Sequence, residues 1–222
     1  MNEIYHIPAM LRETVLGLNV QPDGLYVDVT CGGCGHSRAI LEAMRREGDE
    51  AKGKLYSFDQ DLDALSNAKQ SGMDKHENWQ FVHSNFRYLR NFMDYYGVKQ
   101  IDGLLADLGV SFHHFDCPER GFSFRYSAPL DMRMNQTGGK TAADILNTYS
   151  EEDLARVLYI HGELKTAKPL AKRIVKAREN SPIARTEDLV SIVLGKKVQE
   201  LRSSEVQKWP CIGRGVALRD PS

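Results

Sequence analysis

The stretch YVDVTCGGCGHSRAIL, residues 26–41, joins an alternating apolar run to a glycine-rich turn and then to a segment with helical spacing. A strand that turns through glycines into a helix is typical of the ligand-binding corner of α/β domains. The turn therefore raises the question of what it holds: a phosphate, a metal ion, a reactive thiol pair or a less charged ligand.

Strand-like and helix-like segments alternate around this stretch. The expected strands are 25–30, 54–59, 79–84 and 102–110, and the expected helices are 8–18, 37–46, 61–70 and 86–97. Four strands that alternate with helices predict an α/β domain built on a parallel sheet.

The rhythm changes at residue 111, where a long segment without a clean period begins, rich in aromatic residues and arginines. Helices are expected after Thr141, Ser150 and Thr186, each a suitable N-cap, and the last should end at Gly195. The sequence thus predicts an α/β domain over 1–110, a loop with a helical subdomain over 111–200, and an atypical tail over 201–222.

Composition sets the class of protein. The 222 residues are 41% hydrophobic and 27% charged, with a formal net charge of −1, as in ordinary globular proteins. A nucleic acid would have to bind at a local basic patch, because the electrostatic field of a nearly neutral protein is weak. Since no secretory signal and no apolar run of about 18 residues is present, a cytoplasmic protein without membrane attachment is expected.

Two interpretations of the turn compete with simple tight packing of small residues. Gly33-Cys34-Gly35 begins like a dinucleotide fingerprint, but Arg38 stands where its third glycine belongs. Cys31 and Cys34 form a C-x-x-C pair at a strand-to-helix junction, which suits thiol redox chemistry. A structural zinc site needs two more ligands at similar spacing, so no metal site is predicted.

S-adenosylmethionine is the remaining interpretation. Backbone N–H groups in such a turn can bind a carboxylate, and an acid ending the next strand can hold ribose hydroxyls. Asp59 stands there, with helix capping as its alternative role. Phe86, after the third strand, can flank adenine or fill the core. Asp107 should end the fourth strand, where burying a carboxylate is costly, which favours a functional role.

Four stretches resemble one family: HIPAMLRETVLGLNVQPDGLYVDVTCGGCGHSRAIL, SFDQDLDAL, DGLLADLGVS and ERGFSFRYSAPLDMRMNQ. They resemble the bacterial 16S ribosomal RNA (cytosine-N4)-methyltransferases, called ribosomal small subunit methyltransferase H, over roughly residues 4–200. The resemblance implies a Rossmann-like, S-adenosylmethionine-dependent methyltransferase with a helical insertion after the fourth strand. It also implies methylation of N4 of a cytidine in 16S rRNA, near the decoding centre of the small ribosomal subunit.

The resemblance also implies site residues. The cofactor-binding positions are Gly33, Cys34, Gly35, His36, Asp59, Phe86, Asp107 and His114. Cys34 replaces a glycine of the family's Gly-Gly-His loop, and His114 stands where the family has glutamine. Asp107 is the catalytic candidate, because a cytosine amino group is a poor nucleophile and needs an acceptor for its N–H proton or hydrogen bond.

Two segments are candidates for RNA contact. The first interleaves arginines and aromatic rings: Arg120, Phe122, Phe124, Arg125, Tyr126 and Arg133. Such a mixture suits an unpaired base, although a loop packed on the helical subdomain is the alternative. The second places Lys168, Lys172, Arg173 and Lys176 on one side of a helix, which is either a solvated face or a phosphate contact.

The resemblance stops at about Leu201. Family members continue with further strands, whereas residues 201–222 match nothing in them, which predicts a truncated or frame-shifted end with the C-terminal strands missing. The fourth strand then becomes a sheet edge through which the chain can self-associate. The alternatives to an active methyltransferase are an inactive remnant that still binds S-adenosylmethionine or RNA and, more distantly, a thiol redox protein using Cys31 and Cys34.

Overall fold

The computed structural model describes residue 8, residues 10–45 and residues 52–196 of the chain. The tail expected at 201–222 lies outside these residues. The chain divides into two compact units, Met1–Gly109 and Val110–Ser222. Among the described residues, no helix combines the length and the apolar character that crossing a bilayer requires.

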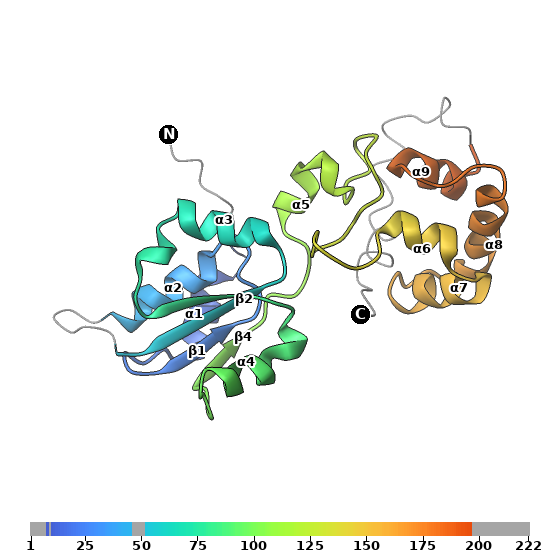
Figure 1. Ribbon diagram of the computed structural model, residues 1–222. Coiled ribbons are helices and arrows are strands. Elements are labelled where there is room, and N and C mark those ends of the chain that lie inside the picture. The colour runs from blue at the N-terminus through green and yellow to red at the C-terminus, as the bar shows by residue number, and fades with distance from the viewer. Residues whose placement is uncertain (1–7, 9, 46–51, 197–222) are drawn as a thin grey trace. The chain divides into compact units, whose positions relative to one another are not determined.

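A parallel sheet lies at the centre of the first unit (Figure 1). Its four strands are β1 (Leu25–Asp28), β2 (Lys54–Asp59), β3 (Trp79–His83) and β4 (Gly103–Leu105), in the order β3-β2-β1-β4. All neighbouring strands are parallel, and Val27 of β1 pairs with Tyr56 of β2 and Leu104 of β4. The predicted α/β class is therefore confirmed.

Helices cover both faces of this sheet (Figure 1). One face carries α1 (Leu11–Leu18), α2 (Gly35–Met44) and α3 (Leu62–Gln70), and the other carries α4 (Leu89–Tyr95). Short 3₁₀ turns, η1 (Met73–Lys75) and η2 (Phe86–Tyr88), flank β3. Because both faces are buried, Tyr26, Val27, Leu55 and Phe58 pack into two apolar clusters, one on each side.

The fourth strand is shorter than predicted. It ends at Leu105 instead of running to residue 110, and in the described sheet it pairs only with β1. An edge strand has one partner to hold its backbone, so the chain leaves the sheet soon after the last bond to β1, from Val29 N–H to the carbonyl of Leu105.

The second unit begins with α5 (Phe112–Asp116), η3 (Pro118–Arg120) and a loop, followed by four helices. These are α6 (Ala142–Thr148), α7 (Glu151–Ile160), α8 (Ala167–Arg178) and α9 (Thr186–Leu194). Thr141 and Ser150 cap α6 and α7 as predicted, by accepting hydrogen bonds from the N–H groups of Asp144 and Asp153. The predicted cap of α9 is wrong: Arg185 is the N-cap, because the Thr186 hydroxyl donates to the Tyr126 carbonyl instead.

This unit has its own apolar core. Leu130 and Met132 of the loop pack with Leu146 of α6, Leu170 of α8 and Leu189 of α9. The long segment predicted after residue 111 is thus an ordered, packed part of the second unit.

Candidate functional site

The turn after β1 is anchored by a buried carboxylate. Asp28 Oδ1 accepts hydrogen bonds from Thr30 N–H at 3.0 Å and from the Thr30 hydroxyl at 3.3 Å. Its Oδ2 accepts from the Ser37 hydroxyl of α2 at 2.6 Å. Burial raises the pKa of Asp28 and these hydrogen bonds lower it, with a net result above the ordinary value. Asp28 thereby joins β1, the turn and the start of α2.

Asp59 holds the same turn from the end of β2. Its Oδ2 accepts from Gly32 N–H at 2.8 Å, and its Oδ1 accepts from Asp61 N–H at 2.9 Å. Gly32 and Cys34 both have positive φ, of 48° and 63°. A Cβ on Gly35 would overlap the ring of Pro8, so that position has no room for a side chain. The predicted turn residues and Asp59 therefore form one structure at the carboxyl ends of β1 and β2.

The cysteine pair is buried inside this turn. The Sγ atoms of Cys31 and Cys34 lie 3.3 Å apart, and Cys34 N–H donates to the Cys31 carbonyl. The hydrogen bond between Cys31 and Cys34 and the burial of Cys31 raise the pKa of Cys31 well above the ordinary thiol value. Because the thiolate is the reactive form, this environment argues against thiol redox chemistry. Within residues 10–45 and 52–196, no three His, Cys, Asp or Glu side chains are grouped as metal ligands.

His36 and Asp107 come together beside the turn. His36 lies in the first turn of α2, and its Nδ1 is 4.0 Å from Asp107 Oδ2. The other ring nitrogen, Nε2, is buried and has no hydrogen-bond partner among the described residues. A buried nitrogen without a partner is costly, so this atom suits the polar group of a ligand.

The prediction that Asp107 is buried is wrong. Its side chain is 57% exposed, because β4 ends two residues earlier at the edge of the sheet. Asp107 N–H donates to the Thr30 hydroxyl at 2.8 Å, which ties its position to the turn after β1. Sequence reasoning missed Thr30; its only signal is a hydroxyl two residues after the buried Asp28.

Phe86 lies after β3 and is 45% exposed, so the alternative role as a core residue is not observed. Its neighbour Asn85 donates from Nδ2 to Gln60 Oε1 at 3.0 Å, and His83 Nε2 lies 3.1 Å from the Gln60 carbonyl oxygen. These contacts join the ends of β2 and β3. Phe86 and the exposed Leu62 leave apolar surface at this edge of the sheet.

His114 lies in the second unit. Its ring is buried against Phe122, with centroids 5.1 Å apart. Its Nδ1 accepts from Ser111 N–H at 3.0 Å and lies 2.8 Å from the Ser111 hydroxyl. Within its own unit, His114 therefore caps the start of α5.

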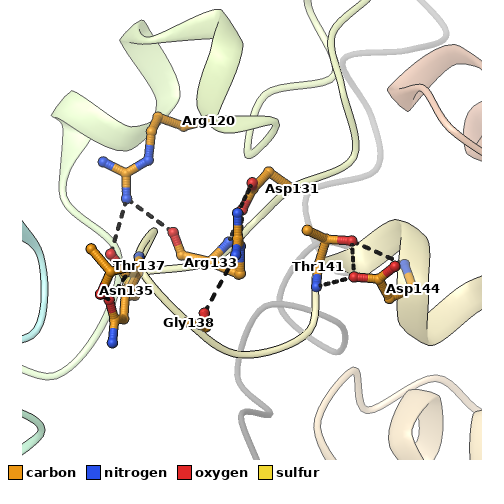
Figure 2. A network of polar contacts seen from close by, with 9 residues as sticks. Arg120, Asp131, Arg133, Asn135, Thr137, Gly138, Thr141 and Asp144 are labelled. Carbon is orange, nitrogen blue, oxygen red and sulfur yellow. Dashed lines mark hydrogen bonds and ion pairs between the residues drawn. The ribbon is translucent and has the colours of Figure 1, made fainter.

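The loop before α6 is held together by two arginines (Figure 2). Arg120 is buried and donates from Nη2 to the carbonyls of Arg133 at 2.9 Å and Met134 at 3.3 Å. Arg133 binds Asp131 with two hydrogen bonds, from Nε at 2.9 Å and from Nη2 at 2.7 Å. For Arg120, Phe122 and Arg133 the alternative of a packed loop is therefore confirmed. Arg125 is exposed and Tyr126 is 50% exposed.

Comparison with known proteins gives the ancestry. The model of the MraW methylase family matches residues 3–208. The chain belongs to this family. It is 49% identical over 206 residues to ribosomal RNA small subunit methyltransferase H of Phocaeicola vulgatus, covering 93% of this chain and 64% of that protein. With the protein of the same name from Parabacteroides distasonis it shares 54% identity over 190 residues, which cover 85% of this chain and 59% of that one.

The predicted resemblance is thus confirmed, and the chain spans about three-fifths of the length of these curated relatives. Among solved structures, TrmN from Thermus thermophilus matches 47% of this chain and 29% of its own, with 15% identity and a TM-score of 0.37.

Proposed function

We propose that this chain uses S-adenosylmethionine to methylate ribosomal RNA of the small subunit, at N4 of a cytidine near the decoding centre. The observation that carries the proposal is the turn of Gly32–His36, braced by Asp28 and Asp59, in a chain of a methylase family. The names of the relatives support the RNA substrate. Such a protein works in the cytoplasm, where ribosomal subunits are assembled.

The residues at this edge of the sheet fit the cofactor. The backbone of Gly33, Cys34 and Gly35, with the unpartnered His36 Nε2, would hold its methionine end. Asp59 would accept hydrogen bonds from the ribose hydroxyls, and Phe86 would cover one side of the adenine. When bound, S-adenosylmethionine supplies an electrophilic methyl group on sulfur.

Asp107 is the proposed acceptor for the substrate. Its exposed carboxylate can accept a hydrogen bond or a proton from the cytosine amino group, which otherwise has little nucleophilic character. The Thr30 hydroxyl fixes the backbone of Asp107, and His36 lies beside its carboxylate. We assign cofactor binding to residues 1–110 and RNA binding to residues 111–200.

Calorimetric titration of the 222-residue chain with S-adenosylmethionine tests the cofactor assignment. Asp59→Asn should weaken binding at least tenfold, because it removes the charge that accepts from ribose. Asp74→Asn, a matched change at an exposed acid in η1, should bind like the wild type. Equal affinity of Asp59→Asn and wild type would defeat the assignment.

Methyl transfer from labelled cofactor to small ribosomal subunits tests the reaction. Asp107→Asn should reduce transfer while cofactor binding remains. If the wild-type chain binds the cofactor but transfers nothing, the alternative of a binding-only protein is correct for this chain.

A further inference from the structure

Helix α8 separates apolar and basic residues onto opposite sides. Ala167, Leu170, Ala171 and Ile174 are buried in the core of the second unit. Lys168, Lys172 and Lys176, here called the lysine stripe, are exposed at intervals of four residues along the other side. We propose that the lysine stripe binds the phosphate backbone of the RNA substrate; this rests on the proposed function.

No residue that the structure describes forms an ion pair with the lysine stripe. None of its three ammonium groups makes an ion pair or hydrogen bond with a described residue, and no acidic residue occurs from Leu164 to Arg178. The two arginines of α8 differ, because Arg173 donates to the Val193 carbonyl and Arg178 to the Leu146 carbonyl. Those two cations hold the helices together, whereas the lysine stripe holds nothing in the described structure.

The spacing of the lysine stripe and the position of Lys168 oppose the stability of α8. Like charges four residues apart repel one another along a helix, and there are two such pairs here. Lys168 lies in the first turn, where the helix dipole disfavours a positive charge, whereas Lys176 lies in the last turn, where the dipole favours one. Helix α7 follows the favourable rule, with Glu151, Glu152 and Asp153 in its first turn. A binding role accounts for a charge arrangement that local stability does not.

The geometry suits a polyanion. Four helical residues rise about 6 Å, so the lysine stripe is a row of cations roughly 12 Å long. Lysine binds phosphate as a flexible point charge and does not read bases. The stripe should therefore position RNA of any sequence, leaving selection of the cytidine to the site beside the turn.

The triple variant Lys168→Gln/Lys172→Gln/Lys176→Gln tests this assignment, with affinity for 16S rRNA measured at several salt concentrations. Three lost phosphate contacts should lower affinity on the order of a hundredfold at 0.1 M salt and reduce the salt slope by about 2 to 3. Binding of S-adenosylmethionine should not change. The melting temperature should stay the same or rise, because repulsion along α8 is removed.

Two further variants separate the lysine stripe from general charge. Lys69→Gln/Lys75→Gln/Lys99→Gln removes the same charge from exposed positions of the first unit and should alter RNA affinity little. Lys168→Arg/Lys172→Arg/Lys176→Arg keeps the charge and should bind like the wild type.

Unchanged affinity of the glutamine triple variant, or an equal loss in the first-unit control, would overturn the proposal while leaving the proposed function standing. A wild-type chain that binds the cofactor but no RNA would refute both. Binding to anionic phospholipid vesicles in place of RNA, lost in the triple variant, would identify a membrane surface as the partner and would also overturn it.

Discussion

Cys34 has a backbone conformation that is unfavourable for a residue with a side chain. It is fully buried and adopts a φ of 63°, in the left-handed region that glycine enters without cost. Its thiol contacts Cys31, so that replacement loses packing as well. Two variants separate these effects, since both lose the thiol and only one restores backbone freedom.

Cys34→Gly should be more stable than Cys34→Ala by about 1 kcal/mol, because alanine keeps the left-handed strain. Urea unfolding of both variants gives the difference directly. In an ordinary helical position the order would be reversed. An alanine variant as stable as the glycine variant would mean that the turn carries no strain at Cys34.

Sequence reasoning predicted the turn and Asp59 because parallel strands bring their carboxyl ends to one edge of the sheet. That rule concerns only the residues that follow each strand. The hydrogen bond from Gly32 N–H to Asp59 joins the ends of β1 and β2, as the rule predicts. It could not predict the exposure of Asp107, which depends on where the edge strand leaves the sheet. It also could not find Thr30, whose role is a contact with a residue 77 positions away.

At the scale of elements, periodicity and capping residues located the four strands and most of the helices, with errors at their ends, but not α5. The loop before α6 had no period, and its order comes from contacts distant in sequence. Leu130 N–H donates to the Ala184 carbonyl, and Met132 N–H donates to the Arg120 carbonyl. Pattern rules cannot anticipate such bonds, so the inward orientation of Arg120 was left open.

The Asp131–Arg133 pair stabilises this loop in a pH-dependent way. Burial raises the pKa of Asp131, and the hydrogen bonds from Arg133 lower it by a larger amount. The net pKa of Asp131 therefore lies below the ordinary value. The unfolded chain therefore binds a proton at higher pH than the folded one. The stabilisation is present above the unfolded pKa of about 3.9 and is lost as the pH falls through the folded value.

Asp131→Asn should lower the free energy of unfolding by about 1 to 3 kcal/mol at pH 7, because it breaks a charged, two-bond contact. The difference from the wild type should shrink below about pH 4. Chemical unfolding at pH 7, 5 and 3 measures it, with Asp116→Asn as an exposed control in α5. A difference that stayed constant with pH would contradict the role of the ionised carboxylate.

At the scale of the whole molecule, each unit has its own core. Two apolar clusters lie within residues 15–105, and Phe58 belongs to one of them. A third cluster, which includes Leu146, lies within residues 110–193. The site that we assign to the cofactor uses the turn after β1, in the first unit. Cofactor binding should therefore stabilise the first unit only. Hydrogen exchange can test this, because it measures the stability of each unit separately.

S-adenosylmethionine at a hundred times its dissociation constant adds about 2.7 kcal/mol to whatever unit binds it. Exchange of the amides of β1, β2 and α2 should then slow on the order of a hundredfold, while those of α6 to α9 should not change. The variant Gly121→Ala tests the converse, because it should destabilise the second unit. Gly121 has a φ of 72°, and a Cβ there would overlap the Pro129 carbonyl oxygen, so the variant should speed exchange in the second unit alone. If the cofactor slowed exchange equally in both units, they would unfold as one cooperative body, and the division of cofactor and RNA binding between them would lose its thermodynamic basis.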